Sequence, residues 1–271
     1  MIGRHFQPQA RSLLVRSFLL PLQHPKKLIK LFWPTYIILA LGFLRWTIGN
    51  SLGSWAGTAF VIVLWLTLFP ITAARLIHWH RWCVLGVPIP TFELNFGKRE
   101  WTYWLFWLEI GAWMLVCFLI VGTPVLLLSF VLIGFHHSQH DGWTMWLTIL
   151  MAFALATIMF AKWCGFYSLR FVGIAIDEPE RGWAIANSGR ELSNYYPWFW
   201  QLLAIILFVS SLLGDFGRAP MKPAQMQLSE AIAVSASWTF MLFGYVVFAT
   251  ALSLFYREHL AKERGENPER P

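Results

Sequence analysis

Residues 103–133, "YWLFWLEIGAWMLVCFLIVGTPVLLLSFVLI", decide the fold, because they form a long apolar run with a single charged side chain, Glu109. A helix needs about 20 such residues to cross the hydrocarbon core of a bilayer. The run therefore predicts a transmembrane helix. It is longer than one straight crossing requires, and Pro124 lies inside it. Proline lacks an amide donor and clashes with the preceding turn, so we expect a kink or break at Pro124.

The rest of the chain has the same character. Hydrophobic residues make up 57% of the 271 residues and charged residues only 13%, with a mean hydropathy of +0.54. Soluble domains contain roughly 25% charged residues, so the apolar excess here must face lipid. Six segments have the composition of membrane spans: 34–52, 55–77, 103–133, 143–168, 198–214 and 231–256.

The expected fold class is therefore all-α, a polytopic membrane protein with six transmembrane helices and cytoplasmic interfacial helices. The six spans define a transmembrane domain at 34–256. A cytoplasmic amphipathic segment at 1–33, with a helix that ends near Pro21, precedes it. A cytoplasmic tail at 257–271 follows it.

The basic residues predict the orientation of these spans. Of the 21 lysines and arginines, only Arg45, Arg218 and Lys222 fall on one predicted side of the membrane. Cytoplasmic loops carry the excess of Lys and Arg, so both termini are expected in the cytoplasm. The same bias accounts for the net charge of +7, and we exclude nucleic acid as a partner.

Three sequence stretches resemble a known group of proteins. They are "LIHWHRWCVLG" (76–86), "LNFGKREWTYW" (94–104) and "IAIDEPERGWAIANSGREL" (174–192). They resemble uncharacterised six-span bacterial inner-membrane proteins, which are similar to the membrane domain fused to some glycerophosphodiester phosphodiesterases. The resemblance spans nearly the whole chain and implies a membrane fold located in a bacterial inner membrane, but it carries over no catalytic residue. Aromatic stretches before the odd-numbered spans and arginines at the ends of the even-numbered ones also predict three helical-hairpin repeats.

His136 and His140 are the candidate metal ligands. They lie four residues apart in "IGFHHSQHDGW" (133–143), a spacing that places two imidazoles on one face of a helix. Glycines within the same stretch favour a loop, and no third ligand is identifiable. We favour the solvated loop and expect no cofactor.

Other potentially reactive residues have simpler interpretations. His78 and His80 in "HWHRW" (78–82) point to different helix faces, and we expect them to contact lipid headgroups. The three cysteines form no C-x-x-C motif, so we expect buried, unreactive thiols at Cys83, Cys117 and Cys164.

Two further motifs predict helix geometry. "GNSLG" (49–53) matches the nucleophile elbow of serine hydrolases, but that elbow needs a strand before it. Gly49, Gly53 and Gly57 instead form G-x-x-x-G steps that predict close helix packing. "DEPERGW" (177–183) predicts a helix start, with Pro179 near the first helical position and solvated carboxylates that cap the first turn.

Glu109 has the strongest functional signal of any single residue, because charges inside membrane spans are rare. It lies about 9–10 Å beyond the start of its span near Tyr103, at about 1.5 Å per residue. The next span returns to the cytoplasm and places Lys162 at a similar depth. We therefore predict an ion pair between Glu109 and Lys162, with a structural role favoured over a functional one.

Together these features favour a non-enzymatic membrane protein that acts as a scaffold, an accessory subunit or a lipid-contacting factor. Its expected partners are membrane lipids and other membrane proteins. Two alternatives stay open. A transporter or channel for a small or amphiphilic substrate is supported by Glu109, Pro124 and the repeat. A metal- or haem-binding redox component rests on the outer histidines.

Overall fold

The computed structural model describes residues 7–48, 54–90, 96–125, 127, 152, 155–156, 159, 165–188 and 223–263. Within these ranges every regular element is a helix, which confirms the all-α prediction for the described part of the chain. The α-helices are α1 (Gln7–Gln23), α2 (Pro25–Ile48), α3 (Ser54–Leu85), α4 (Lys98–Cys117), α7 (Leu169–Ala175), α8 (Pro179–Ser188) and α10 (Pro223–Glu263).

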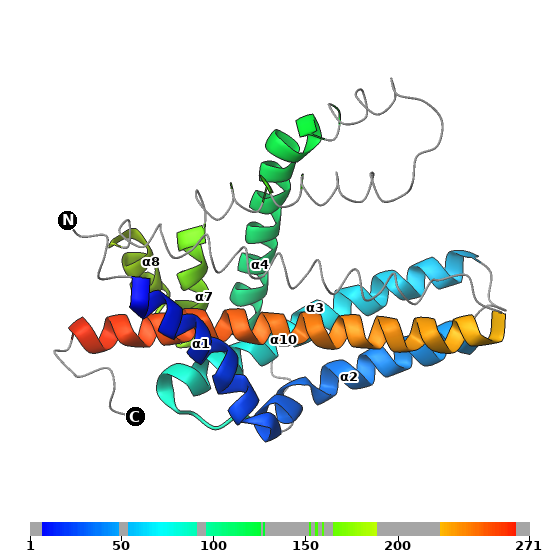
Figure 1. Cartoon of the computed structure of the whole chain (residues 1–271), viewed down its shortest axis with the longest axis horizontal. Coiled ribbons are helices and arrows are strands. Elements are labelled where there is room, and N and C mark those ends of the chain that lie inside the picture. Colours follow the sequence, from blue (N-terminus) through cyan, green and yellow to red (C-terminus); the bar gives the residue numbers. More distant parts are fainter. Residues whose placement is uncertain are drawn as a thin grey trace.

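The three long helices α2, α3 and α10 run alongside one another, with α3 in contact with both α2 and α10 (Figure 1). α1 packs across α10, and α4 leaves the group at a steep angle. The short helices α7 and α8 pack on each other, and α7 also contacts α3, α4 and α10. The ends of most described helices therefore meet around α7, and the rest of α4 points away from this junction.

α1 and α2 are separated by a single residue, His24. The His24 amide donates to the Pro21 carbonyl at 3.1 Å, so α1 ends two residues after Pro21, close to the predicted end. Pro25 opens α2, where a missing amide proton costs nothing because the first amides of a helix have no partner inside it. The His24 carbonyl accepts the amides of Lys27 and Leu28 and completes the corner.

α3 ends at a glycine in the left-handed conformation. Gly86 has φ +70° and donates its amide to the Trp82 carbonyl at 3.1 Å, a conformation that glycine adopts without steric cost. The segment after it returns along α3, where the fully buried Arg75 donates to the Pro90 carbonyl at 3.1 Å. Arg75 therefore fastens the segment 86–90 to the helix that precedes it.

α4 continues into a π-helix over Phe118–Gly122 and then into helical residues 123–125. The Thr123 amide donates to the Phe118 carbonyl, five residues back, as a π-turn requires. The irregularity therefore lies immediately before Pro124, where we expected a kink. Proline has no amide to offer the carbonyl four residues earlier, and that residue, Ile120, lies inside the π-helix.

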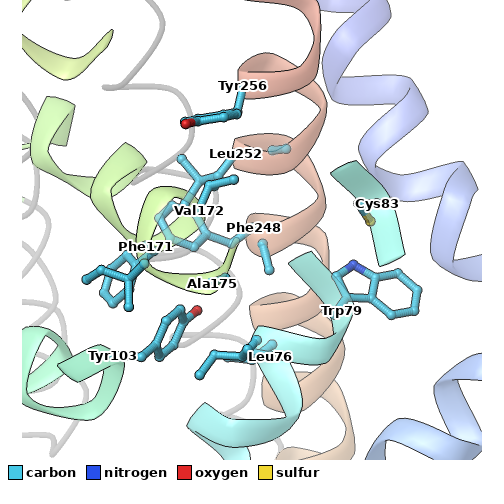
Figure 2. Close-up of a cluster of buried hydrophobic side chains, with 14 of the residues drawn as sticks. Leu76, Trp79, Cys83, Tyr103, Phe171, Val172, Ala175, Phe248, Leu252 and Tyr256 are labelled. Atoms are coloured by element: carbon cyan, nitrogen blue, oxygen red, sulfur yellow. The ribbon is translucent and has the colours of Figure 1, made fainter. Parts of the chain in front are cut away.

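The core lies where α3, α4, α7 and α10 meet (Figure 2). Phe171 of α7 is at its centre, and its ring centroid lies 4.9 Å from that of Tyr103, 4.6 Å from Phe106 and 5.2 Å from Trp107. Trp79 and Tyr256, both fully buried, flank it on α3 and α10. Aromatic packing of this kind holds the start of α4 against α7.

α7 and α8 approach each other through two glycines. A Cβ atom added at Gly173 would lie 2.9 Å from the Cα of Gly182 and 2.8 Å from the Glu178 carbonyl oxygen. Between the helices the chain turns at Asp177, a non-glycine residue with φ +65°. α8 begins at Pro179, which confirms the helix start predicted from "DEPERGW".

Two described helical segments are long and apolar enough to cross a membrane, Lys98–Val125 and Thr239–Ala261. They overlap the third and sixth predicted spans, and α10 extends beyond both ends of the sixth. The other four spans stay predictions. Most of the second segment is buried, whereas only 22% of the most apolar stretch of the first is buried. α4 therefore exposes an apolar surface that the described helices do not cover.

Candidate functional site

A buried polar layer around His80 joins α3, α4 and α10. The His80 side chain is 1% exposed, and its Nδ1 atom lies 2.7 Å from Ser253 Oγ on α10. Its Nε2 atom lies 3.0 Å from Tyr103 Oη on α4. The neighbouring Trp79 donates its indole N–H to Thr250 Oγ1 at 2.8 Å. Two consecutive side chains of α3 thus bind polar groups on α10.

The protons of this layer have one consistent arrangement. Ser253 Oγ donates its single proton to the Ala249 carbonyl at 2.9 Å, so toward His80 it can only accept. His80 therefore carries its proton on Nδ1, and Nε2 accepts the proton of the Tyr103 hydroxyl. Both ring nitrogens are satisfied by the neutral imidazole. A second proton, on Nε2, would force the Tyr103 hydroxyl to turn its own proton away from the ring.

Burial strongly lowers the pKa of His80, from 6.5 to about 3, because desolvation disfavours the imidazolium ion. The prediction that His80 contacts lipid headgroups is therefore wrong. The helical register directs His80 into the core, while His78, two residues earlier, is half-buried. The polar partners in the core were missed, although Thr250 and Ser253 share one face of an apolar helix and could have indicated them.

Ion pairs surround this layer at the ends of the helices. Asp177 Oδ2 accepts hydrogen bonds from the guanidinium groups of Arg81 and Arg99, each at 3.0 Å. Arg181 on α8 binds Glu263 on α10 at 2.9 Å. The sequence predicted that the carboxylates of "DEPERGW" are solvated caps. Asp177 is exposed as expected, but it also ties the α7–α8 turn to α3 and α4.

These ion pairs are at least partly exposed, and such pairs contribute about 0–1 kcal/mol each. They organise the helix ends rather than provide most of the stability. Every cation in them belongs to the group of basic residues that the sequence assigned to the cytoplasmic side. The structure thus gathers arginines from three separate parts of the chain: Arg81 at the end of α3, Arg99 at the start of α4 and Arg181 at the start of α8.

An apolar cavity of about 390 Å³ lies between α3, α4 and α10. Its walls include Leu66 and Leu76 from α3, Trp104 and Trp107 from α4, and Tyr245 from α10. It lies where α4 diverges from the long helices, and its lining is almost entirely apolar. Hydrocarbon rather than a polar substrate fits such a surface.

Glu109 lies on α4, with its side chain 53% exposed, and its Oε2 atom is 4.0 Å from the guanidinium Nη1 of Arg170 on α7. The Arg170 guanidinium carbon also lies 5.2 Å from the centroid of the Phe106 ring, at cation–π distance. Lys162 lies outside the described residues, so its ion pair with Glu109 stays a prediction. The contact with Arg170 was not predicted, because Arg170 lies beyond the expected end of its span.

The remaining predicted site residues are mostly outside the described ranges, namely His136, His140, Gly49, Gly53 and Cys164. Gly57 lies in α3. Cys83 and Cys117 are buried free thiols, which confirms the expectation for these two. Among the residues that the structure describes, no group of three or more His, Cys, Asp or Glu side chains could hold a metal ion.

Comparison with known proteins gives no family for this chain, since no protein-family model, curated protein or solved structure matches it.

Proposed function

We propose that this protein is a non-enzymatic integral protein of a bacterial cytoplasmic membrane, acting as a lipid-contacting scaffold or accessory subunit. The observation that carries the proposal is the apolar surface of α4. Large hydrophobic side chains along this helix and the π-helix that continues it are exposed, among them Leu105, Leu108, Trp113, Leu115 and Leu119. Soluble proteins rarely expose so continuous an apolar surface, and lipid is the solvent that it fits.

The arrangement of polar groups supports a scaffold. The described polar side chains at the junction of α3, α4 and α10 bind one another and hold the helices together. His80 is neutral and has both ring nitrogens engaged, so it is poorly placed to transfer a proton to a substrate. The charged side chains around the junction are engaged in ion pairs between helix ends.

The proposal includes the number of spans, the side of the membrane on which the termini lie and the relatives of the protein. The protein has six spans and both termini in the cytoplasm, and it is related to the six-span inner-membrane proteins that its sequence resembles. The support is the distribution of basic residues and the clustering of Arg81, Arg99 and Arg181 at one junction of helix ends.

Membrane extraction combined with reporter fusions tests this proposal. The protein should stay in the membrane fraction after an alkaline carbonate wash and be released by detergent. Fusions after Arg99, Arg190 and Pro271 should report the cytoplasm. Fusions at Gly53, Ser138 and Met221 should report the opposite side. Release by carbonate would contradict membrane integration, and an outside signal after Arg99 would contradict the topology.

A transporter of a small amphiphilic substrate is the second candidate, and Glu109 is the observation that favours it. A carboxylate on an otherwise apolar helix is typical of ion and substrate pathways. Here Glu109 lies at 4.0 Å from a basic side chain, which also suits a structural contact. In liposomes containing the purified protein, a proton leak that is lost with Glu109→Gln would favour the transporter over the scaffold.

A further inference from the structure

A second pocket, of about 350 Å³, lies between α1, the end of α3 and α10. It is separate from the apolar cavity beside α4 and shares no lining residue with it. Leu19, Leu20 and Leu254 form much of its apolar surface together with Trp82, and Arg16 and Arg257 also line it. The pocket therefore combines hydrocarbon contacts with two guanidinium groups.

The surroundings of the pocket are positively charged. The Nζ atom of Lys27 lies 3.8 Å from the centroid of the Trp82 ring, at cation–π distance. Glu258 Oε1 binds Arg16 at 3.0 Å and places one negative charge beside the pocket. Three of the four charged residues named here are cationic and one is anionic: Arg16, Arg257, Lys27 and Glu258.

The charges around the pocket also act on two titratable side chains. Burial raises the pKa of the Cys83 thiol, which lines the pocket, while the charges of Lys27 and Arg257 act to lower it. The pKa of His24, whose ring lies 5.0 Å from Trp82, is lowered by desolvation and then by Lys27. Burial is the larger cause of both shifts, and the charge of Lys27 acts on each group in the direction expected of a cationic site.

We propose that this pocket binds an anionic phospholipid, with its phosphate against Arg16 and Arg257 and the upper part of an acyl chain against the leucines and Trp82. The proposal rests on the proposed function, since it needs a membrane around the protein. Guanidinium groups suit phosphate, and the volume is within the range of small-ligand sites.

The position of the pocket identifies a lipid as the occupant rather than a soluble anion. Arg16 precedes the first predicted span and Arg257 directly follows the last, so both lie at the predicted cytoplasmic boundary, where anionic headgroups gather. A free phosphate ion has no use for the apolar part of the lining. Arg16 is already bound to Glu258, so a lipid phosphate must compete with that carboxylate.

Native mass spectrometry of the detergent-purified full chain, with phosphatidylglycerol and phosphatidylcholine in equal amounts, tests the proposal. Phosphatidylglycerol should bind preferentially. Arg16→Gln and Arg257→Gln should each lower that preference roughly fivefold, the effect expected for one basic residue near anionic lipid. Glu258→Gln should raise it, because it releases Arg16 from its carboxylate. Lys98→Gln, an equal loss of charge on α4 away from the pocket, should leave it unchanged.

Three results would overturn the proposal. Equal binding of both lipids to the wild-type protein excludes an anionic lipid site. An equal effect of Arg257→Gln and Lys98→Gln indicates diffuse attraction by the basic surface. Displacement of phosphatidylglycerol by inorganic phosphate alone indicates a free-anion site. All three leave membrane integration intact, whereas release by the carbonate wash contradicts the proposed function itself. Thermal unfolding of each variant confirms that it is folded, and Glu258→Gln provides a gain of binding that misfolding cannot produce.

Discussion

The Nδ1 atom of His80 lies 2.7 Å from the Oγ atom of Ser253, a contact between residues 173 positions apart in the sequence. It joins α3 to α10 inside the core, and it determines the protonation of the histidine, since Ser253 gives its own proton to the Ala249 carbonyl. The helix junction is therefore held by a polar contact in which the neutral imidazole donates to Ser253 and accepts from Tyr103.

This contact predicts a loss of stability in acid. The pKa of His80 is about 3 in the folded protein, below its ordinary value of 6.5. Between these two pH values His80 binds more protons in the unfolded chain than in the folded protein. The contribution of His80 to the free energy of unfolding is therefore fully present above pH 6.5 and falls as the pH is lowered. The decrease is about 1.4 kcal/mol per pH unit within that window. Thermal unfolding in detergent across this range measures it.

The matched variants are His80→Gln and His259→Gln. His80→Gln should unfold at lower temperature near neutral pH and lose most of the acid sensitivity. His259 lies on the partly exposed surface of α10, 3.4 Å from Glu263, and its variant should keep that sensitivity. Equal acid sensitivity in wild type and His80→Gln would show that other groups cause it.

The glycine contact between α7 and α8 predicts a steric effect. Gly173→Ala places a methyl group 2.8 Å from the Glu178 carbonyl and 2.9 Å from the Gly182 backbone, so the helices must move apart. We expect a loss of about 1–3 kcal/mol in stability. Gly111→Ala on α4 is the control, because its methyl group meets nothing within 4 Å and should stabilise the helix by up to about 1 kcal/mol. If both variants unfold at the same temperature, the close approach is not important for stability.

Sequence reasoning succeeded where the signal is local. Apolar composition predicted helices, and α8 begins at Pro179, the residue expected near its first position. It failed for His80, whose partners Tyr103 and Ser253 come from distant parts of the chain. Residue spacing reports which face of a helix a side chain occupies, but not what packs against that face. For the same reason the binding of Asp177 by two arginines was not foreseen.

If the exposed face of α4 contacts lipid, the cost of inserting this helix into the membrane should depend on where along it an arginine is introduced. Leu115 lies toward the middle of the apolar segment Lys98–Val125, and Leu105 lies nearer its start, with both side chains exposed. Leu115→Arg should reduce the fraction of molecules that export a reporter at Ser138, because arginine at a span centre costs about 2.5–3.5 kcal/mol. Leu105→Arg should have a small effect, because its long side chain can reach the headgroups. Equal export by both variants would mean that α4 does not cross the bilayer.

Glu109 allows a choice between two basic partners. Its carboxylate lies 4.0 Å from Arg170, at the outer limit for an ion pair, so this pair should contribute less than about 1 kcal/mol. The predicted partner within the membrane is Lys162, and a desolvated pair behaves differently. Removing one partner leaves an uncompensated charge, whereas removing both costs less than the sum.

Double-mutant cycles that combine Glu109→Gln with Lys162→Met or with Arg170→Gln, read by thermal stability in detergent, measure each coupling. We expect a large coupling to Lys162 and a small one to Arg170. Arg99→Gln is the control and should add to Glu109→Gln without coupling, because Arg99 binds Asp177. Additive losses with Lys162→Met would refute the predicted pair and leave Arg170 as the residue that holds the Glu109 carboxylate.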